Sequence, residues 1–471
     1  MKSNALLVII LIVIVAIVGI YFGYNMLFNK PNLTNISNES LPLNNTNSST
    51  NITSSNNYQN LTTHTIISSN TTSTNNYQNT SNNYLNNYLG YNQYIPIKIY
   101  NTQNIPTPAP FQQQIAICDG DVNIGPNFAY VNNETLLYRI HPNGQNVMFF
   151  SLNNRLLYSW YLGELFIYDE EDEIINEIIT CYIWWIKLDN GIPANSNVTI
   201  YMYIGNGSSN FYQQYYPYVG ASPDVFPSRQ YDNGKYVFIV YGYFNNTTDG
   251  WTGYVYNGTF TPTATPDGIQ MLNNDNWQGT YILPPNNGNI PKIPLIVEEA
   301  WYSSNIWGSN VIALFGNTSQ QLPAGAIGST AGGATPASNL STLAEYNQDR
   351  KYIYLKSAVT NTTLERTYFS TPYSPDGTFY SYLIVNFTHS QAGCYHYSHG
   401  YGQVWAPLTL LNTYTIHNHG SVSKSLNYNP FQYGTLQISA GTSRYTSYQY
   451  IQWVVARAYP PNGVMPRIYI G

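Results

Sequence analysis

The sequence predicts an all-β protein that is carried on one N-terminal transmembrane helix and a disordered linker. From residue 94 onward, short runs of β-branched and aromatic residues alternate with Gly, Pro and Asn turns, a pattern typical of β-sandwiches and jelly rolls. Residues 5–28 are almost entirely apolar, and about 20 such residues are enough to cross a bilayer. Residues 29–93 are rich in Asn, Ser, Thr and Tyr, and they cannot bury a core.

The apolar run indicates an uncleaved anchor. The apolar stretch of a signal peptide usually has about 7–15 residues and ends in a small-x-small site, whereas this run is longer and no Ala-x-Ala follows it. A cleaved signal peptide and a pilin-type leader cut before the run are the alternatives. We therefore expect a short cytoplasmic or interior tail at residues 1–4 and a bilayer contact through residues 5–28. The bulk of this single-pass membrane protein would be extracellular, on a cell surface or a virion envelope.

Sequons support an exposed location, because Asn-x-Ser/Thr acceptors are surface positions in exported proteins. Chance explains part of their number in a chain so rich in Asn and Thr, but their density between residues 29 and 93 favours a glycosylated stalk. The predicted glycosylation sites are Asn32, Asn35, Asn38, Asn44, Asn47, Asn51, Asn60, Asn70, Asn79, Asn133, Asn197, Asn206, Asn245, Asn246, Asn257, Asn317, Asn339, Asn361 and Asn386.

The charge content is low. Only 8% of the residues are charged and 47 are Tyr, against about 25% charged residues in ordinary soluble domains. A surface covered by amides and hydroxyls suits an acidic exterior, where carboxylates are protonated and bases would leave an uncompensated charge. No Lys/Arg cluster exists, so nucleic acid is not an expected partner.

Cysteine usage allows a disulfide in an exported protein. Cys118 and Cys181 could pair, which would leave Cys394 alone. Three buried apolar cysteines are the alternative. No spacing of Cys and His typical of a metal site is present.

Strands are predicted where apolar and polar residues alternate or β-branched residues gather. One stretch, residues 169–179, is compatible with a helix or a strand. The clearest predicted strands are residues 95–100, 197–204, 235–241, 379–387 and 450–457.

Several segments resemble a family of archaeal surface proteins, in which a small β-domain of unknown function precedes a concanavalin-A-like (laminin-G-like) jelly roll. The most specific is Trp185-Ile-Lys-Leu188 followed by Gly191-Ile-Pro-Ala-Asn-Ser-Asn-Val-Thr-Ile-Tyr-Met-Tyr-Ile-Gly-Asn206, and Gln230-Tyr-Asp-Asn-Gly-Lys-Tyr-Val-Phe238 is similar to the family's link between domains. The other similar segments are Asn101–Gln113, Leu157–Trp160 and Ala456–Pro466.

The resemblance implies a small β-domain at residues 94–229 and a concanavalin-A-like jelly roll at residues 230–471. It implies no established reaction, although concanavalin-like relatives often bind carbohydrate. The family's usual Phe-Tyr-Asp-Asn-Phe after the link is replaced here by Tyr241-Gly-Tyr-Phe-Asn245. Any role of that acid elsewhere in the family is therefore not carried over to this chain.

The candidate metal ligands are Asp169, Glu171 and Glu173, because carboxylates at this density could hold Ca²⁺. The run lacks the Gly turn of a known calcium loop, so a solvated acidic loop is the alternative, and no cofactor is expected. Two His pairs, His396 with His399 and His417 with His419, could bind a metal if their segments adjoin. Exposed polar loops are the alternative there.

The candidate ligand-binding residues are Trp251, Trp301, Trp307 and Glu299. Aromatic rings stack on sugars and suit interfaces, although most must build the core and cross-strand pairs. Glu298 and Glu299 are adjacent in a predicted strand, so they point to opposite faces and cannot flank one sugar as a glycosidase pair does. No nucleophile motif or phosphate loop is present, so no catalytic residue and no enzyme activity are predicted.

These observations predict a membrane-anchored, glycosylated surface protein that displays β-sandwich modules for recognition or adhesion. Its expected partners are glycans or surface proteins. One alternative is a structural coat, S-layer or virion-surface component that binds no ligand. Another is an unusual glycoside hydrolase.

Overall fold

The computed structural model describes most of residues 94–471. The gaps are residues 123–125, 127, 170–176, 257–259, 274–278, 287, 304–308, 316–339, 348–351, 358–361, 369–377, 387–388, 398–415, 426–434 and 441–446. The chain divides into two units after Asn75, and the described residues all belong to the second. The predicted tail, anchor and stalk lie outside the described residues. No helix in the part of the chain that the structure describes has the length and apolar character needed to span a bilayer.

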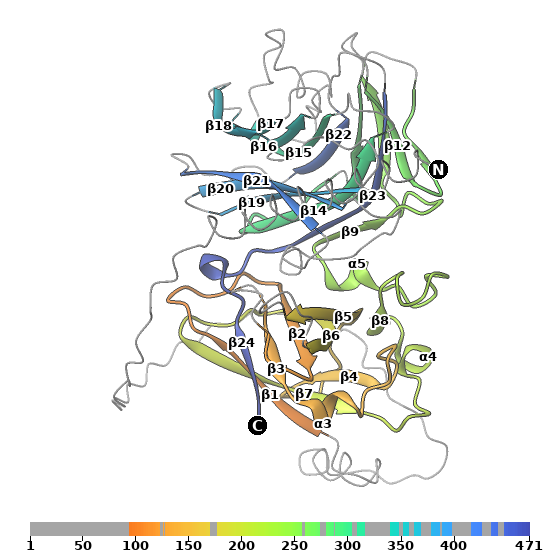
Figure 1. Ribbon diagram of the computed structural model, residues 1–471, viewed down its shortest axis with the longest axis vertical. Coiled ribbons are helices and arrows are strands. Elements are labelled where there is room, and N and C mark those ends of the chain that lie inside the picture. The colour runs from red at the N-terminus through yellow and green to blue at the C-terminus, as the bar shows by residue number, and fades with distance from the viewer. Residues whose placement is uncertain are drawn as a thin grey trace, which may run out of the picture. The chain divides into compact units, whose positions relative to one another are not determined.

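The fold is mostly β-sheet with a few short helices (Figure 1), which confirms the predicted all-β class. The predicted first module contains two sheets of described strands. One has the order β24-β1-β7-β4 and the other β3-β2-β6-β5-β8. Their bounds are β1 Tyr94–Asn101, β2 Phe111–Cys118, β3 Tyr130–Asn132, β4 Val147–Ser151, β5 Ser159–Asp169, β6 Glu177–Leu188, β7 Ser196–Ile204, β8 Val219–Ala221 and β24 Arg467–Ile470.

The C-terminal strand β24 does not stay with the second module. It pairs antiparallel with β1, with Ile97 opposite Ile470 and Ile99 opposite Ile468. Ile97, Ile99 and Ile468 are buried, so this pairing closes an apolar face of the first module. The predicted boundary, which put all of residues 230–471 in the jelly roll, therefore differs from the structure at residues 467–470.

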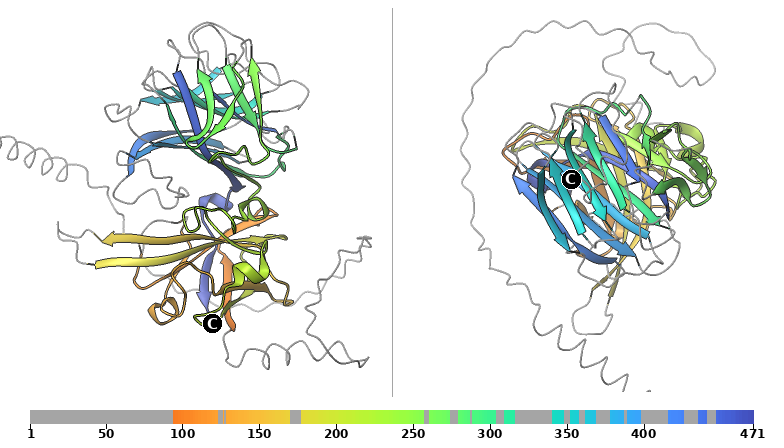
Figure 2. Two further views of the ribbon diagram at one scale, coloured as in Figure 1. Left: turned by 90° about the vertical axis from the view of Figure 1, so that its right-hand side faces the viewer. Right: turned by 90° about the horizontal axis from the view of Figure 1, so that it is seen from above.

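The second module is one large sheet that folds over into two layers (Figure 2). The described strands run in the order β18-β17-β16-β15-β22-β13-β12-β23-β14-β19-β20-β21, with β9, β10 and β11 paired at its sides. The bounds are β9 Val240–Tyr243, β10 Thr252–Tyr256, β11 Thr263–Thr265, β12 Gly268–Asn273, β13 Gly279–Leu283, β14 Leu295–Ser303, β15 Ser309–Phe315, β16 Leu340–Asn347, β17 Tyr352–Ser357, β18 Thr362–Tyr368, β19 Thr378–Val385, β20 His389–Tyr397, β21 Ile416–Ser425, β22 Thr435–Ala440 and β23 Ser447–Ala458.

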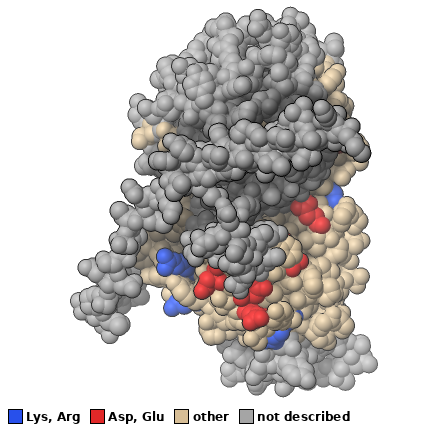
Figure 3. All heavy atoms as spheres, viewed as in Figure 1, with Lys and Arg blue, Asp and Glu red and all other residues tan. Residues whose placement is uncertain are grey.

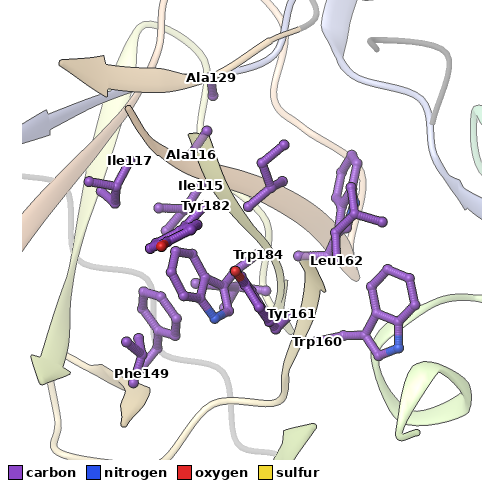
Figure 4. Packing of buried hydrophobic residues seen from close by; sticks show 14 of the residues in the cluster. Ile115, Ala116, Ile117, Ala129, Phe149, Trp160, Tyr161, Leu162, Tyr182 and Trp184 are labelled. Atoms are coloured by element: carbon purple, nitrogen blue, oxygen red, sulfur yellow. The ribbon is translucent and has the colours of Figure 1, made fainter. Parts of the chain in front are cut away.

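Two apolar cores hold these layers. One lies inside the second module and includes Trp301, Leu383 and Ile438. The other fills the first module around Trp160 and Trp184 (Figure 4) and continues onto the facing side of β23 at Trp453 and neighbouring positions. The described modules therefore share one buried apolar cluster.

Polar contacts reinforce this junction. Gln112 is fully buried in β2, where its Nε2 donates to the Val237 carbonyl at 3.2 Å and its Oε1 accepts from the Ala458 amide at 2.8 Å. Gln113 donates to the Pro466 carbonyl at 3.0 Å. Amides buried with partners avoid the cost of an unsatisfied polar group and fix where the second module's chain passes the first.

The junction also contains a buried ion pair. The Arg457 Nε in β23 lies 3.0 Å from Glu298 Oε2 in β14, with side-chain exposures of 3% and 5%. The same guanidinium lies 4.9 Å from the ring centroid of Trp185 in β6. The charged pair of the second module is thus covered by an aromatic ring of the first.

A disulfide joins Cys118 and Cys181, the pairing considered from the sequence. The two residues lie directly opposite each other in the antiparallel register of β2 and β6. Both are fully buried. The bridge therefore joins the neighbouring strands β2 and β6 at the end of β2.

Short helices lie in the loops between the strands. They are α3 Glu134–Leu137, α4 Phe211–Tyr215, α5 Gly234–Val237 and the 3₁₀ turn η3 Pro461–Gly463. The predicted strand at residues 235–241 is wrong in its first half, because α5 precedes the short strand β9. The remaining clear predictions coincide with β1, β7, β19 and β23 to within a few residues.

Candidate functional site

A polar pocket of about 370 Å³ lies where the link between the modules meets the start of the second module. It combines two basic residues, two acids and a tyrosine in a chain that is only 8% charged. In the described part of the face that Figure 3 shows, Lys, Arg, Asp and Glu side chains form a few small groups among other residues. The residues that line the pocket are Arg229, Asp232, Lys235, Tyr241, Asp249 and Gly250.

Arg229 organises one wall of the pocket. Its Nη2 donates to Asp249 Oδ2 at 2.7 Å and to Asp232 Oδ2 at 3.2 Å, and its Nη1 donates to the Tyr243 carbonyl at 2.9 Å. The guanidinium also lies 4.9 Å from the Tyr243 ring centroid. Asp249 Oδ2 accepts from the Tyr243 amide at 2.8 Å. These contacts hold the Asp249 loop against β9.

Asp232 also lines the pocket, and its side chain is only 3% exposed. It accepts hydrogen bonds from the Tyr241 hydroxyl at 2.8 Å, from Trp160 Nε1 at 3.2 Å and from the Gly234 amide at 3.2 Å. Trp160 belongs to the first module and Tyr241 to the second. Asp232 therefore connects the two modules through hydrogen bonds. These bonds fix the orientation of its carboxylate before any ligand binds.

Two glycines permit this close packing. A Cβ at Gly234 would lie 2.2 Å from the Tyr241 ring, and one at Gly220 would lie 2.2 Å from the Asn233 side chain. The Asn233 amide is itself buried and donates to the Ser159 and Pro217 carbonyls. The Asp-Asn-Gly link thus packs closely against the first module. A side chain at either glycine would clash with these contacts.

The pocket offers hydrogen-bonding groups of both kinds. The side chains of Arg229 and Asp249 are 22% and 21% exposed, and Lys235 is exposed. Carboxylate oxygens accept from hydroxyls, whereas the ammonium and guanidinium donate to them. The two formal positive charges equal the two negative charges, so the site suits a neutral ligand rich in hydroxyls rather than a strongly charged one.

The described residues contain no cluster of three or more His, Cys, Asp or Glu side chains that could hold a metal ion. A second hollow lies at the module junction beside Arg457 and Trp185, but it measures about 20 Å³. That volume holds about one water molecule. The polar pocket is therefore the better candidate for a ligand.

Burial raises the pKa of Asp232, while hydrogen bonds from Tyr241 and the charge of Arg229 oppose that rise. A raised folded-state pKa means that the folded protein keeps this proton to higher pH than the unfolded chain does. Ionised Asp232 therefore costs stability above its folded pKa, and this cost disappears as the pH falls toward the unfolded value.

We expect the free energy of unfolding of the native chain, relative to that of Asp232→Asn, to increase as the pH is lowered from 7 toward about 4, the usual pKa of an unfolded Asp. The substitution removes the titrating group, so the difference isolates it. Urea unfolding of both proteins across this range measures the effect. A difference that stays constant, or that moves in the opposite direction, would show that Asp232 does not titrate in this way.

The structure corrects the predicted ligand-binding residues. Trp251 is 3% exposed and donates from Nε1 to the Tyr241 carbonyl, and Trp301 is fully buried and donates to Ser381 Oγ. Glu299 is fully buried in β14. All three lie in the interior because they point into the sandwich, so they present no surface to a ligand. Trp307 lies outside the described residues.

The predicted metal ligands are only partly described. Asp169 ends β5, and Glu171 and Glu173 lie outside the described residues, so Ca²⁺ binding there stays a prediction. The His segments do adjoin: His396 in β20 is opposite His417 in β21. His399 falls outside the described residues.

Six predicted glycosylation sites lie in the described residues. Asn197, Asn206, Asn245 and Asn246 are exposed, whereas Asn133 and Asn386 are half-buried. The side chain of Asn133 caps α3 by accepting from the Leu136 amide at 2.9 Å. The other thirteen acceptors lie outside the described residues, and glycosylation itself stays a prediction throughout.

One relative comes from an archaeal virus. Over 385 residues the chain is 24% identical to "Uncharacterized protein 562" of Sulfolobus islandicus rod-shaped virus 1. The match covers 79% of this chain and 57% of the viral protein, so this chain spans little more than half the length of that relative. No protein-family model matches the chain.

Solved structures with similar strand arrangements include lectins and a carbohydrate-binding module. Lectin I of Ulex europaeus, in complex with the methyl glycoside of α-L-fucose, is 8% identical and covers 46% of this chain and 96% of its own, with a TM-score of 0.28. A legume lectin-like domain of Entamoeba histolytica is 11% identical, and the match covers 48% of this chain and 92% of that domain, with a TM-score of 0.29. The carbohydrate-binding module CBM66 of Bacillus subtilis is 11% identical, and the match covers 44% of this chain and 96% of that module, with a TM-score of 0.26. At these TM-scores, no functional conclusion follows from the likeness.

Proposed function

We propose that this chain is a surface-displayed recognition protein that binds neutral carbohydrate in the polar pocket. The observation that carries the proposal is the preorganised set of Arg229, Asp232 and Asp249, fixed by hydrogen bonds between the link and β9. Saccharides present many hydroxyls in fixed directions, and a rigid array of donors and acceptors recognises them without paying the entropy of ordering side chains.

The rest of the chain supports the proposal of surface display. The predicted anchor at residues 5–28 and the glycosylated stalk at residues 29–93 would hold the β-modules outside a membrane. A flexible stalk of this length reaches about 45 Å, from about 5–6 Å times the square root of its length. The exposed sequons at Asn197, Asn206 and Asn245 suit an exported protein. We include a virion among the surfaces on which the modules would be displayed, because one relative is a viral protein.

An unusual glycoside hydrolase is the less favoured alternative. Glu298 is paired with Arg457 in the module junction, and Glu299 is buried in the same strand. Adjacent strand residues face opposite sides, so these carboxylates do not flank one substrate. We therefore keep the proposal of a binding protein and assign no catalytic residue.

Asp249→Asn is expected to weaken carbohydrate binding by about tenfold or more, since a charged acceptor contributes about 1.5–3 kcal/mol to a hydrogen bond. Asn keeps an oxygen for the Tyr243 amide, so the fold should persist. Calorimetric titration with the tightest sugar from a glycan array measures the change. Asp267→Asn, which alters an exposed acid in the turn between β11 and β12, is the matched control. If Asp249→Asn and the native chain bind the sugar with equal affinity, the pocket is not the binding site.

A further inference from the structure

We propose that the polar pocket continues onto a surface of stacked tyrosines, and that both together bind an extended neutral oligosaccharide. This inference rests on the proposed function and names its ligand class. The tyrosine surface consists of Tyr158, Tyr216, Tyr218 and Tyr236, and sequence reasoning did not single it out.

Three of these rings form a stack. The Tyr158 ring stacks with those of Tyr218 and Tyr236, with centroid distances of 4.5 and 5.6 Å and interplanar angles of 15° and 6°. Tyr158 precedes β5, Tyr218 precedes β8 and Tyr236 lies in α5. Segments distant in the sequence thus converge to build one aromatic surface.

This surface is accessible. Tyr216 and Tyr218 are 44% and 37% exposed, although burying a large apolar ring is ordinarily favourable. Stacking on Tyr158 restricts the Tyr218 ring before any ligand binds. Rigid, amphipathic tyrosines provide contact area at a low entropic cost, which is the property that a saccharide platform requires.

The tyrosine surface is continuous with the pocket. Lys235, which lines the pocket, lies with its Nζ 5.1 Å from the Tyr236 ring centroid. The Tyr216 hydroxyl donates to the backbone carbonyl of Asp232 at 3.2 Å. A ligand that fills the pocket is therefore beside the exposed rings.

The ring faces and the pocket serve different parts of such a ligand. Hydroxyls of one unit meet the ionic groups, and the apolar faces of following units meet the tyrosines, where aromatic contacts are favourable. The formal charges of Arg229 and Lys235 balance those of Asp232 and Asp249, so the pocket is compatible with any neutral sugar unit. Affinity should therefore depend on the number of sugar units.

The test is calorimetric titration of the full chain with manno- and chito-oligosaccharides of one to six units. We expect affinity to rise by about tenfold between one and four units, equivalent to an aromatic contribution of about 1.4 kcal/mol. Tyr218→Ala should remove this rise, and a circular dichroism spectrum equal to that of the native chain checks that the variant is folded. Tyr218→Phe, which keeps the ring, should retain the rise.

Tyr469→Ala is the control, because Tyr469 is another exposed tyrosine, 48% exposed, on β24. It should bind as the native chain does. If one and six units bind equally, or if Tyr218→Ala weakens both alike, the extended site is wrong while pocket binding stands. If no sugar of either series binds, and a glycan array finds no other, the proposed function fails together with the inference.

Discussion

Arg457→Met is expected to lower the free energy of unfolding by about 3–5 kcal/mol, because it leaves the carboxylate of Glu298 buried without its cation. The pair is almost fully enclosed, with side-chain exposures of 3% and 5%. Methionine fills most of the volume but cannot hydrogen-bond the acid. Urea unfolding followed by tryptophan fluorescence measures the loss.

Two controls separate this effect from packing. The double variant Arg457→Met with Glu298→Gln removes both charges, so it should be less destabilised than Arg457→Met alone. Arg155→Met breaks an exposed pair with Asp189, whose side chains are 66% and 42% exposed, and should cost at most about 1 kcal/mol. A loss for Arg457→Met no larger than that of Arg155→Met would contradict the assigned role.

Removing the disulfide with Cys118→Ser and Cys181→Ser is expected to lower the free energy of unfolding by about 4 kcal/mol, the loop-entropy value for a closed loop of this length. The two cysteines are 63 residues apart. Both serines would also be buried in place of apolar sulfurs, which adds to the loss. Denaturant unfolding of the double variant against the native chain measures it.

Reductant provides the matched comparison. It should move the native chain toward the stability of the double variant and leave the variant unchanged. If reductant changes neither protein, and mass spectrometry finds free thiols at Cys118 and Cys181 in the native chain, then the bridge is absent and the predicted loss has no basis.

The strands were predictable where the local pattern and the tertiary environment agree. Residues 197–204 carry β-branched and aromatic residues before a Gly-Asn-Gly turn, and β7 ends at Ile204. The same holds for β19 and β23. Strand pairing over long separations was not predictable, because the return of β24 to β1 depends on burying Ile468 beside Ile97 and Ile99 rather than on any local signal.

The link between the modules shows where periodicity misleads. Residues 235–241 contain the β-rich run Tyr-Val-Phe-Ile-Val-Tyr, yet the run begins as the helix α5. Gly234 packs against the Tyr241 ring and the Asn233 amide is tied to the first module. Tertiary contacts of this kind override a local strand preference.

The buried glutamines of β2 are a second case in which tertiary contacts override the local sequence preference. Gln112, Gln113 and Gln114 are fully buried, although amide side chains are usually exposed. The acceptor and the donor that satisfy Gln112, the Val237 carbonyl and the Ala458 amide, come from the other module, whereas Gln114 accepts from the Ala129 amide of its own module. Nothing in the local sequence indicates these partners.

The candidate site was only partly visible in the sequence. The Asp-Asn-Gly link was noted for its resemblance, but its acid was not assigned to a pocket, and the tryptophans chosen as ligand contacts are buried. One signal could have found the site: Arg229, Asp232, Lys235 and Asp249 lie within a short segment of a chain of which only 8% is charged. Clustered charge in such a background indicates a place where ionic groups are needed.

The most direct test of the central claim is a glycan-array screen of the purified full-length chain at acidic and neutral pH. The account predicts saturable binding to neutral oligosaccharides, and weaker binding by Asp249→Asn on the same array. A correctly folded chain that binds no glycan at either pH would contradict carbohydrate recognition and favour a structural surface component.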